Sequence, residues 1–174
     1  MNLLQVAIFD NKVLLQELAQ LLNRIHAGDK NFYNDNLEVL NSITIGAHVR
    51  HILEHYQIFF KALDIEVPIN YDSRERCTGC QNCAKTAIDV IQELVKELES
   101  MSPLDNSVEV SLITNPSLKD MVSQSSILRE MQFLQSHTVH HLAIIGIALR
   151  QKGFTVDGNM TKAPSTRQFE SSAS

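Results

Sequence analysis

Six of the seven histidines in this chain fall into two clusters that lie far apart in the sequence. The clusters are His48, His51 and His55 and His137, His140 and His141. On a helix that turns 100° per residue, the first cluster spans about 60° of the surface and the second spans about 100°. Two such strips on facing helices could bring three imidazoles to one ion. The histidines therefore predict a metal site.

The spacing of the second cluster supports this prediction. His137 and His141 are four residues apart, which lets two ring nitrogens of one helix reach the same ion. Three imidazoles with no fourth protein ligand leave a coordination position open, as in catalytic zinc sites. We rank zinc first, and nickel and iron remain open because imidazole suits all three metals. The alternative is that the histidines bind one another or nearby carboxylates as buried polar groups.

Four charged residues could assist such a site. Glu54 lies near the edge of the first histidine strip, and Glu130 lies two helical turns before His137. Either glutamate could orient a ligand imidazole or act as a general base, or it could simply lie on the surface. One of Arg74 and Arg76 could hold a substrate carboxylate or phosphate with two parallel hydrogen bonds. The alternative for both arginines is a solvated loop whose charges pair with one another.

The three cysteines, Cys77, Cys80 and Cys83, follow a C-x-x-C-x-x-C pattern. Iron–sulfur and structural zinc sites normally take four ligands, which three cysteines do not supply. We therefore interpret the pattern as a loop and helix start with free thiols, with a redox pair or a thiol metal site as alternatives. A helix that begins near Thr78 would lower the pKa of a neighbouring thiol.

Four stretches of the chain carry apolar residues at helical spacing and must position these side chains. They span residues 3–27, 43–63, 80–101 and 127–152. Ser42 can cap the second helix, and Ser125 or Ser126 can cap the fourth. The pattern predicts an all-α fold, an up-and-down four-helix bundle in which the second and fourth helices carry the histidine strips.

A short β-hairpin is predicted just before the last helix, because apolar and polar residues alternate there. The alternating apolar residues are Val108, Val110 and Leu112 before the turn and Leu118, Met121 and Val122 after it. Asn115-Pro116-Ser117 has the composition of a turn. We expect residues 1–155 to form the bundle domain and residues 156–174 to form a C-terminal tail, which its composition predicts to be flexible.

Composition and charge exclude several function classes. A chain of 174 residues suits one domain, and its 6 glycines and 4 prolines supply too few turns for a β-sandwich. A net charge of −5 without a lysine or arginine cluster argues against nucleic-acid binding. The longest apolar run, residues 142–149, is far shorter than the roughly 20 residues that span a bilayer. No secretory signal is recognised near residue 1, so we expect a cytoplasmic protein with no membrane partner.

The histidine motifs resemble those of a known family. Residues 45–55 read I-G-A-H-V-R-H-I-L-E-H, and residues 137–141 read H-T-V-H-H. Both are similar to motifs of the DinB-like superfamily, and the resemblance covers most of the chain. Members hold a divalent metal in a four-helix bundle, with one histidine of the second helix and an H-x-x-x-H pair of the last. The resemblance implies three ligands: His51, His137 and His141. It leaves three alternative or supporting residues: His48, His55 and His140.

Two further stretches resemble a subgroup of uncharacterised members of this superfamily. They are Tyr71-Asp72-Ser73-Arg74-Glu75-Arg76 and Ala163-Pro164-Ser165-Thr166, and the second implies that the tail packs at a specific place. The superfamily includes S-transferases and isomerases that use low-molecular-weight thiols. We therefore expect a homodimeric, metal-dependent transferase or hydrolase that acts on a small molecule, such as a low-molecular-weight thiol. The alternatives are a non-catalytic metal-braced stress-response or interaction protein, and a thiol sensor.

Overall fold

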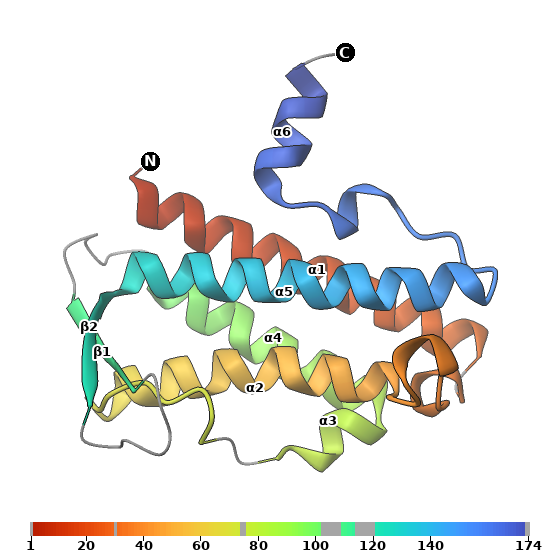
Figure 1. Ribbon diagram of the computed structural model, residues 1–174, viewed down its shortest axis with the longest axis horizontal. Coiled ribbons are helices and arrows are strands. Elements are labelled where there is room, and N and C mark those ends of the chain that lie inside the picture. Colours follow the sequence, from red (N-terminus) through yellow and green to blue (C-terminus); the bar gives the residue numbers. More distant parts are fainter. Residues whose placement is uncertain (1, 30, 74–75, 102–108, 114–120, 173–174) are drawn as a thin grey trace.

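The computed structural model describes residues 2–29, 31–73, 76–101, 109–113 and 121–172, which are mostly helical with one small antiparallel sheet. Four long helices lie side by side (Figure 1): α1 (Leu3–Gly28), α2 (Ile45–Asp64), α4 (Ala84–Ser100) and α5 (Ile127–Gln151). The shorter α-helices are α3 (Thr78–Asn82) and α6 (Pro164–Ser172). Three single 3₁₀ turns cover Phe32–Asn34, Glu38–Leu40 and Asn159–Thr161.

Polar side chains cap α1, α2 and α5 at their N-termini. The side chain of Asn2 starts α1, and together with Gln5 it forms a capping box. Thr44 caps α2 and Ser126 caps α5, each by accepting a hydrogen bond from the backbone N–H three residues later. The prediction for Ser126 is confirmed, whereas that for Ser42 is wrong. Ser42 lies in the left-handed region with φ 62°, so α2 begins after it.

The long helices do not alternate in direction along the chain. In Figure 1, α1 and α5 run one way, and α2 and α4 run the other. The start of α4 lies beside the start of α2, because Gln81, just before α4, accepts a hydrogen bond from Arg50 near the start of α2. The up-and-down order predicted from the sequence is therefore wrong for α2 and α4. The physical reason is the long connection between them, which returns along α2 and lets two consecutive helices run parallel.

Apolar side chains from the four long helices fill the core, including Leu14, Leu18, Ile52, Leu94, Leu134 and Ile145. A small buried polar network crosses this core. The Tyr56 hydroxyl donates to Asn11 Oδ1 at 2.6 Å and lies 3.0 Å from Thr138 Oγ1. The Asn11 side-chain amide also donates to the Met131 carbonyl at 2.9 Å. Because these buried groups have partners, the network stabilises the relative position of α1, α2 and α5. Its member Thr138 directly follows His137 in the chain.

The predicted pairing of two short strands before α5 is confirmed. β1 (Glu109–Ile113) pairs antiparallel with β2 (Val122–Ser126), and Glu109 lies opposite Ser126. The turn expected at 115–117 lies outside the described residues. Ile69, after α2, extends this small sheet, because it exchanges backbone hydrogen bonds of 2.8 and 2.9 Å with Ser111 and Ile113. The sheet thus holds the segment after α2 close to the start of α5.

The C-terminal segment packs against the long helices at a few residues. Val156 and Met160 are buried, and the Arg167 guanidinium donates to both carboxylate oxygens of Glu17 at 2.7 and 2.8 Å. Beyond this ion pair, α6 projects away from the long helices (Figure 1). A segment that its composition predicts to be flexible thus contacts the long helices through a few apolar residues and one bidentate ion pair.

Among the residues that the structure describes, no helix combines the length and the apolar character that crossing a bilayer requires.

Candidate metal centre

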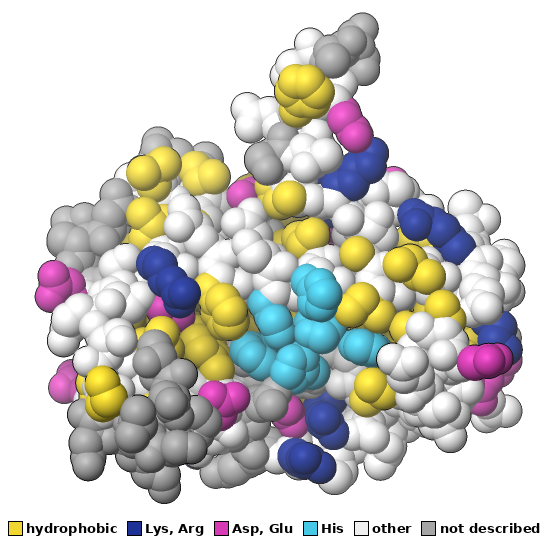
Figure 2. All heavy atoms as spheres, in the orientation of Figure 1, with side chains coloured by type: hydrophobic (Ala, Val, Ile, Leu, Met, Phe, Trp, Pro, Cys, Tyr) yellow, Lys and Arg dark blue, Asp and Glu magenta, His cyan; other side chains and the backbone are white. Residues whose placement is uncertain are grey.

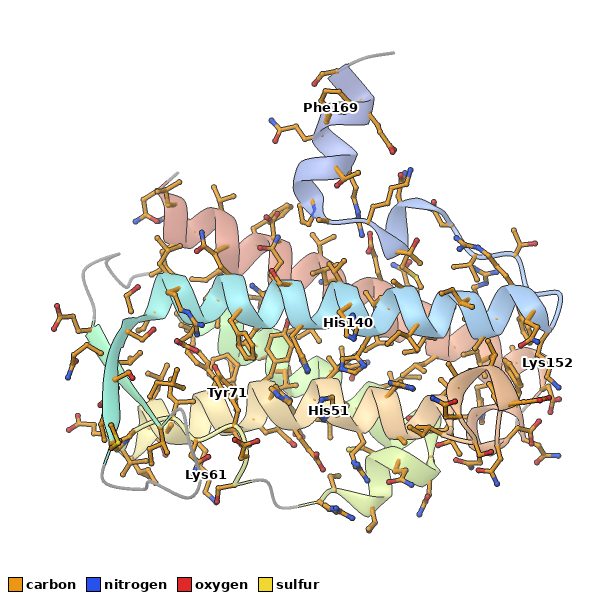
Figure 3. All side chains as sticks on the ribbon, in the orientation of Figure 1. His51, Lys61, Tyr71, His140, Lys152 and Phe169 are labelled. Atoms are coloured by element: carbon orange, nitrogen blue, oxygen red, sulfur yellow. The ribbon has the colours of Figure 1, made fainter. Side chains whose placement is uncertain are left out.

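The two histidine clusters meet where α2 packs against α5. These helices are antiparallel, so His48 lies opposite His141 and His51 lies opposite His137. The Nδ1 atoms of His48 and His141 are 3.0 Å apart. In Figure 3, His51 on α2 and the exposed His140 on α5 both lie at the contact between these helices. Figure 2 shows that the histidines form one continuous patch that reaches the surface of this face.

Three ring nitrogens converge at the centre of the patch. Nε2 of His137 lies 3.1 Å from Nε2 of His51 and 3.2 Å from Nε2 of His141. Two imidazole nitrogens bound to one tetrahedral zinc ion at about 2.0 Å would be about 3.3 Å apart. A single N–H at Nε2 of His137 can donate a well-aligned hydrogen bond to His51 or to His141 but not to both, whereas one ion could bind all three nitrogens. The donor types and their spacing therefore fit a divalent metal ion.

A second set of three histidines shares two members with the first. One ring nitrogen from each of His51, His55 and His137 lies within 4.8 Å of the others. Nδ1 of the buried His55 donates to the backbone carbonyl of His51 at 2.8 Å, which puts the lone pair of the neutral ring on Nε2. The structure thus brings four imidazoles together, with His51 and His137 common to both sets and His141 or His55 as the third donor.

The protein environment keeps the central imidazoles neutral. Burial, and then the neighbouring histidines, lower the pKa of His137 to about 2 and the pKa of His141 to about 3. Burial also lowers the pKa of His48. Metal ions bind the neutral form of imidazole, so these rings need not lose a proton to bind one. The buried Nδ1 of His137, on the other side of the ring from the converging Nε2, has no hydrogen-bond partner among the described residues.

Two aromatic side chains flank the histidines at one end. Tyr71 stacks on His55 with ring centroids 5.3 Å apart, and it projects into the space between α2 and α5 (Figure 3). The Phe133 ring centroid lies 4.9 Å from that of Tyr71 and 5.7 Å from that of His137. Sequence reasoning missed both residues as parts of the site. The helical spacing of Phe133, four residues before His137, could have identified it, whereas no spacing rule places Tyr71.

Glu130 is buried, but it contacts Tyr71 rather than a ligand imidazole. Its carboxylate accepts hydrogen bonds from the Tyr71 hydroxyl at 3.0 Å, the Ser125 hydroxyl at 2.5 Å and the Arg129 guanidinium at 2.8 Å. Burial, followed by the Glu130 carboxylate, raises the pKa of Tyr71, so its hydroxyl stays a donor. The structure therefore places Tyr71 between Glu130 and His55, and Glu130 orients the aromatic ring that stacks on the histidine.

Glu54 and Arg76 lie at a different cavity. The buried Glu54 carboxylate lies 3.3 Å from Nε of Arg50 and accepts a hydrogen bond from the backbone N–H of Cys77 at 3.1 Å. Glu54, Cys77 and the exposed Arg76 line a cavity of about 360 Å³ whose lining contains no histidine. Arg74 lies outside the described residues. The structure thus brings Glu54 and Arg76 together, but beside Cys77 rather than at the histidines.

The cysteines form the predicted loop and helix start with free thiols. Cys77 is the N-cap of α3, Cys80 is buried, and Cys83 is exposed. Burial, and then the neighbouring Cys77, raise the pKa of Cys80 to about 12, whereas hydrogen bonds from Thr86 lower the pKa of Cys83. Among the described residues, the group of three or more side chains that could bind a metal ion consists of histidines. The three cysteines do not form a second group of this kind.

Comparisons with known proteins identify one partial relative. No family model matches the chain, and no solved structure matches it. Over 104 residues the chain is 33% identical to FK506-binding protein 5 of Rhizopus delemar, a match that covers 58% of this chain and 27% of that protein. The chain therefore spans about a quarter of the length of this relative.

Proposed function

We propose that this protein binds one divalent metal ion through His51, His137 and His141 and uses it for a transfer or hydrolysis reaction on a small molecule. The observation that carries the proposal is the spacing of the three Nε2 atoms, with separations of 3.1 and 3.2 Å about His137. A bound divalent ion supplies a Lewis acid that polarises an oxygen or lowers the pKa of a group bound to it. Zinc is the first candidate, followed by nickel and iron.

The same proposal places the chain in the DinB-like superfamily as a four-helix bundle of α1, α2, α4 and α5. Two features support this assignment. The histidine motifs that resemble the superfamily lie on α2 and α5, which face each other. The Ala163-Pro164 stretch that resembles the uncharacterised subgroup starts α6, next to the residues that anchor the tail.

A low-molecular-weight thiol is the proposed substrate class. The histidine patch reaches the surface (Figure 2), so a small molecule can approach the ion from this face. A thiolate is a soft ligand, which suits zinc and other borderline ions. Tyr71 and Phe133 would supply apolar contact area for such a substrate beside the histidines.

A second candidate function is a metal brace without catalysis, and the position of His55 favours it. The ring centroids of His55 and His137 are 4.0 Å apart, which makes His55 available as a fourth ligand. Four protein ligands would close the coordination sphere, as in structural zinc sites. In that case the ion would tie α2 to α5 and would not meet a substrate.

The metal proposal is tested by measuring the metal content of protein purified without a histidine tag. We expect about one equivalent of ion in the wild-type protein and in His26→Ala, because His26 is exposed on α1 and lies outside both clusters. We expect His137→Ala to lose the ion, since His137 belongs to both ligand sets. Equal metal content in His137→Ala and His26→Ala would refute the proposal.

A titration of the cobalt-substituted protein separates the catalyst from the brace. Azide or a low-molecular-weight thiol would change the absorption bands of the metal if a coordination position is open. No change at any ligand concentration would show that protein groups complete the coordination, and the brace would then be the function. Repeating the titration with His55→Ala would show whether His55 is the group that closes the site.

A further inference from the structure

Cys77 and Cys80 form a pair of facing thiols away from the histidines. Their Sγ atoms lie 2.8 Å apart, and a disulfide bond is about 2.05 Å long, so a further approach of about 0.7 Å would join them. Both residues are free thiols in this structure. Cys83, the third cysteine, is exposed and does not line the cavity beside Cys77.

The backbone around these two cysteines is held tightly. The backbone N–H of Cys77 donates to Glu54 Oε1 at 3.1 Å, and the Tyr33 hydroxyl donates to the Cys80 carbonyl at 2.6 Å. Between the two cysteines and α4, the Gln81 side chain accepts a hydrogen bond from Arg50. These contacts attach both ends of the pair to the rest of the molecule, so little conformational freedom would be lost when the sulfurs join.

The two thiols differ in access. Cys77 is half-buried and lines the cavity of about 360 Å³, a volume within the usual range for small-molecule sites. Cys80 is fully buried behind it. An incoming reagent would therefore meet Cys77 first, and Cys80 could reach only the sulfur of Cys77.

We propose that Cys77 and Cys80 are a thiol–disulfide exchange site that reduces low-molecular-weight disulfides carrying carboxylates. The cavity beside Cys77 suits this class because Lys61 and Arg76, both exposed cations, are part of its lining. The buried Glu54 carboxylate in the same lining is engaged by Arg50 and by the Cys77 backbone. The proposal does not depend on the metal centre, since no histidine lines this cavity.

The exchange runs in two balanced steps. The Cys77 thiolate attacks one sulfur of the disulfide R–S–S–R, the S–S bond of the reagent breaks, and R–S⁻ leaves and takes up the proton that Cys77 lost. The Cys80 thiolate then attacks the Cys77 sulfur, and the second R–S⁻ leaves and takes up the proton from Cys80. One small disulfide is reduced to two thiols, and the two cysteines are oxidised to one disulfide.

The order of attack also agrees with the acidity of the thiols. Burial raises the pKa of Cys80 to about 12, and the neighbouring Cys77 contributes to this shift. Once Cys77 is part of a mixed disulfide, its thiolate no longer opposes the ionisation of Cys80. Burial still raises the pKa of Cys80, but the contribution of Cys77 is then removed, so Cys80 is a better nucleophile after the first step than before it.

The test uses full-length protein in a Cys83→Ser background, which removes the exposed thiol. The reduced protein is mixed with oxidised glutathione, an anionic disulfide, and the products are followed by intact mass spectrometry in the presence and absence of a metal chelator. We expect a protein lighter by two hydrogen atoms with no adduct. With Cys80→Ser added, we expect one glutathione trapped on Cys77. With Cys77→Ser added instead, we expect no adduct, because Cys80 is buried.

Two results would overturn the proposal. One is the absence of an adduct on Cys77 in the Cys80→Ser protein, provided that its circular dichroism spectrum matches the wild type. The other is an adduct on Cys80 in the Cys77→Ser protein that forms as fast as the one on Cys77.

The charge preference is tested with cystamine, a cationic disulfide. Oxidised glutathione should react faster than cystamine. A variant that combines Arg76→Ala with Lys61→Ala should reduce the ratio of the two rates about tenfold. An unchanged preference would overturn the assigned substrate class.

Discussion

His51 on α2 and His137 on α5 direct their Nε2 atoms at each other at a distance of 3.1 Å, although 86 residues separate them in the sequence. This pair belongs to both sets of three histidines that could bind an ion. Two neutral imidazoles in this arrangement can share one proton, whereas an ion would engage both lone pairs. His51 and His137 are therefore ligands in either set, and the two sets differ only in whether His141 or His55 is the third ligand.

We expect His141 to contribute more to metal affinity than His55. His141 Nε2 lies 3.2 Å from His137 Nε2, whereas His55 already uses Nδ1 on the backbone of His51. His141→Ala should lower the affinity by more than about 100-fold, and His55→Ala should lower it by about tenfold, as for a supporting residue. Competition with a chromophoric chelator measures both values. The reverse order would make His55 the third ligand.

The metal-free protein should lose stability as the pH falls. In the folded state, burial holds the pKa of His137 and of His141 far below the ordinary value of about 6.5 that applies to the unfolded chain. Below about pH 6.5 the unfolded chain therefore binds more protons, and the free energy of unfolding decreases from there toward pH 3. Urea unfolding in the presence of a chelator at several pH values measures this slope. His141→Gln should have a shallower slope, and an equal slope would contradict this explanation.

Gly46→Ala should destabilise the protein, because α3 packs directly on α2 at this position. A β-carbon at Gly46 would lie 2.0 Å from the backbone oxygen of Gln81. We expect the free energy of unfolding to fall by about 1–3 kcal/mol, as for other overpacked sites. Gly158→Ala is the control, since among the described residues beyond Gly158 and its two neighbours no heavy atom lies within 4 Å of its β-carbon position. Equal urea midpoints for the two variants would show that α3 can move away at little cost.

Tyr71→Phe should separate the role of the hydroxyl from that of the ring. The substitution keeps the ring that stacks on His55 but removes the hydrogen bond to the buried Glu130. We expect a loss of about 1–3 kcal/mol in the free energy of unfolding, since a buried carboxylate loses one donor. Metal content should stay close to that of the wild type. A large loss of metal without loss of stability would instead place the hydroxyl in the metal centre.

Cysteine alkylation should follow the order Cys83, Cys77, Cys80. Hydrogen bonds from Thr86 lower the pKa of Cys83, which raises its thiolate fraction near neutral pH, and Cys83 is also the exposed one of the three thiols. Cys80 is buried and its pKa is raised to about 12. Iodoacetamide labelling at pH 7 followed by peptide mass spectrometry gives the order. Early labelling of Cys80 would show that α3 opens readily.

The sequence by itself predicted the helices and the histidine strips, because both depend on local periodicity. Apolar residues at helical spacing located the long helices to within a few residues. Alternating residues located the first strand, whereas the second strand begins at Val122, where the predicted alternation ended. The positions of His51 and His137 on their helices follow from the same 100° step. A helical strip of histidines is a property of one segment, so it needs no knowledge of the neighbouring segments.

Contacts between segments were decided only by the tertiary structure. Three of these contacts depend on how the long connection after α2 folds back. It lets α2 and α4 run parallel, and it places Tyr71 between Glu130 and His55. It also brings Arg76 to the cavity that Glu54 lines. The separations of the histidine nitrogens likewise depend on the depth and register at which α2 packs against α5. These quantities arise from the packing of the whole core, which no local pattern specifies.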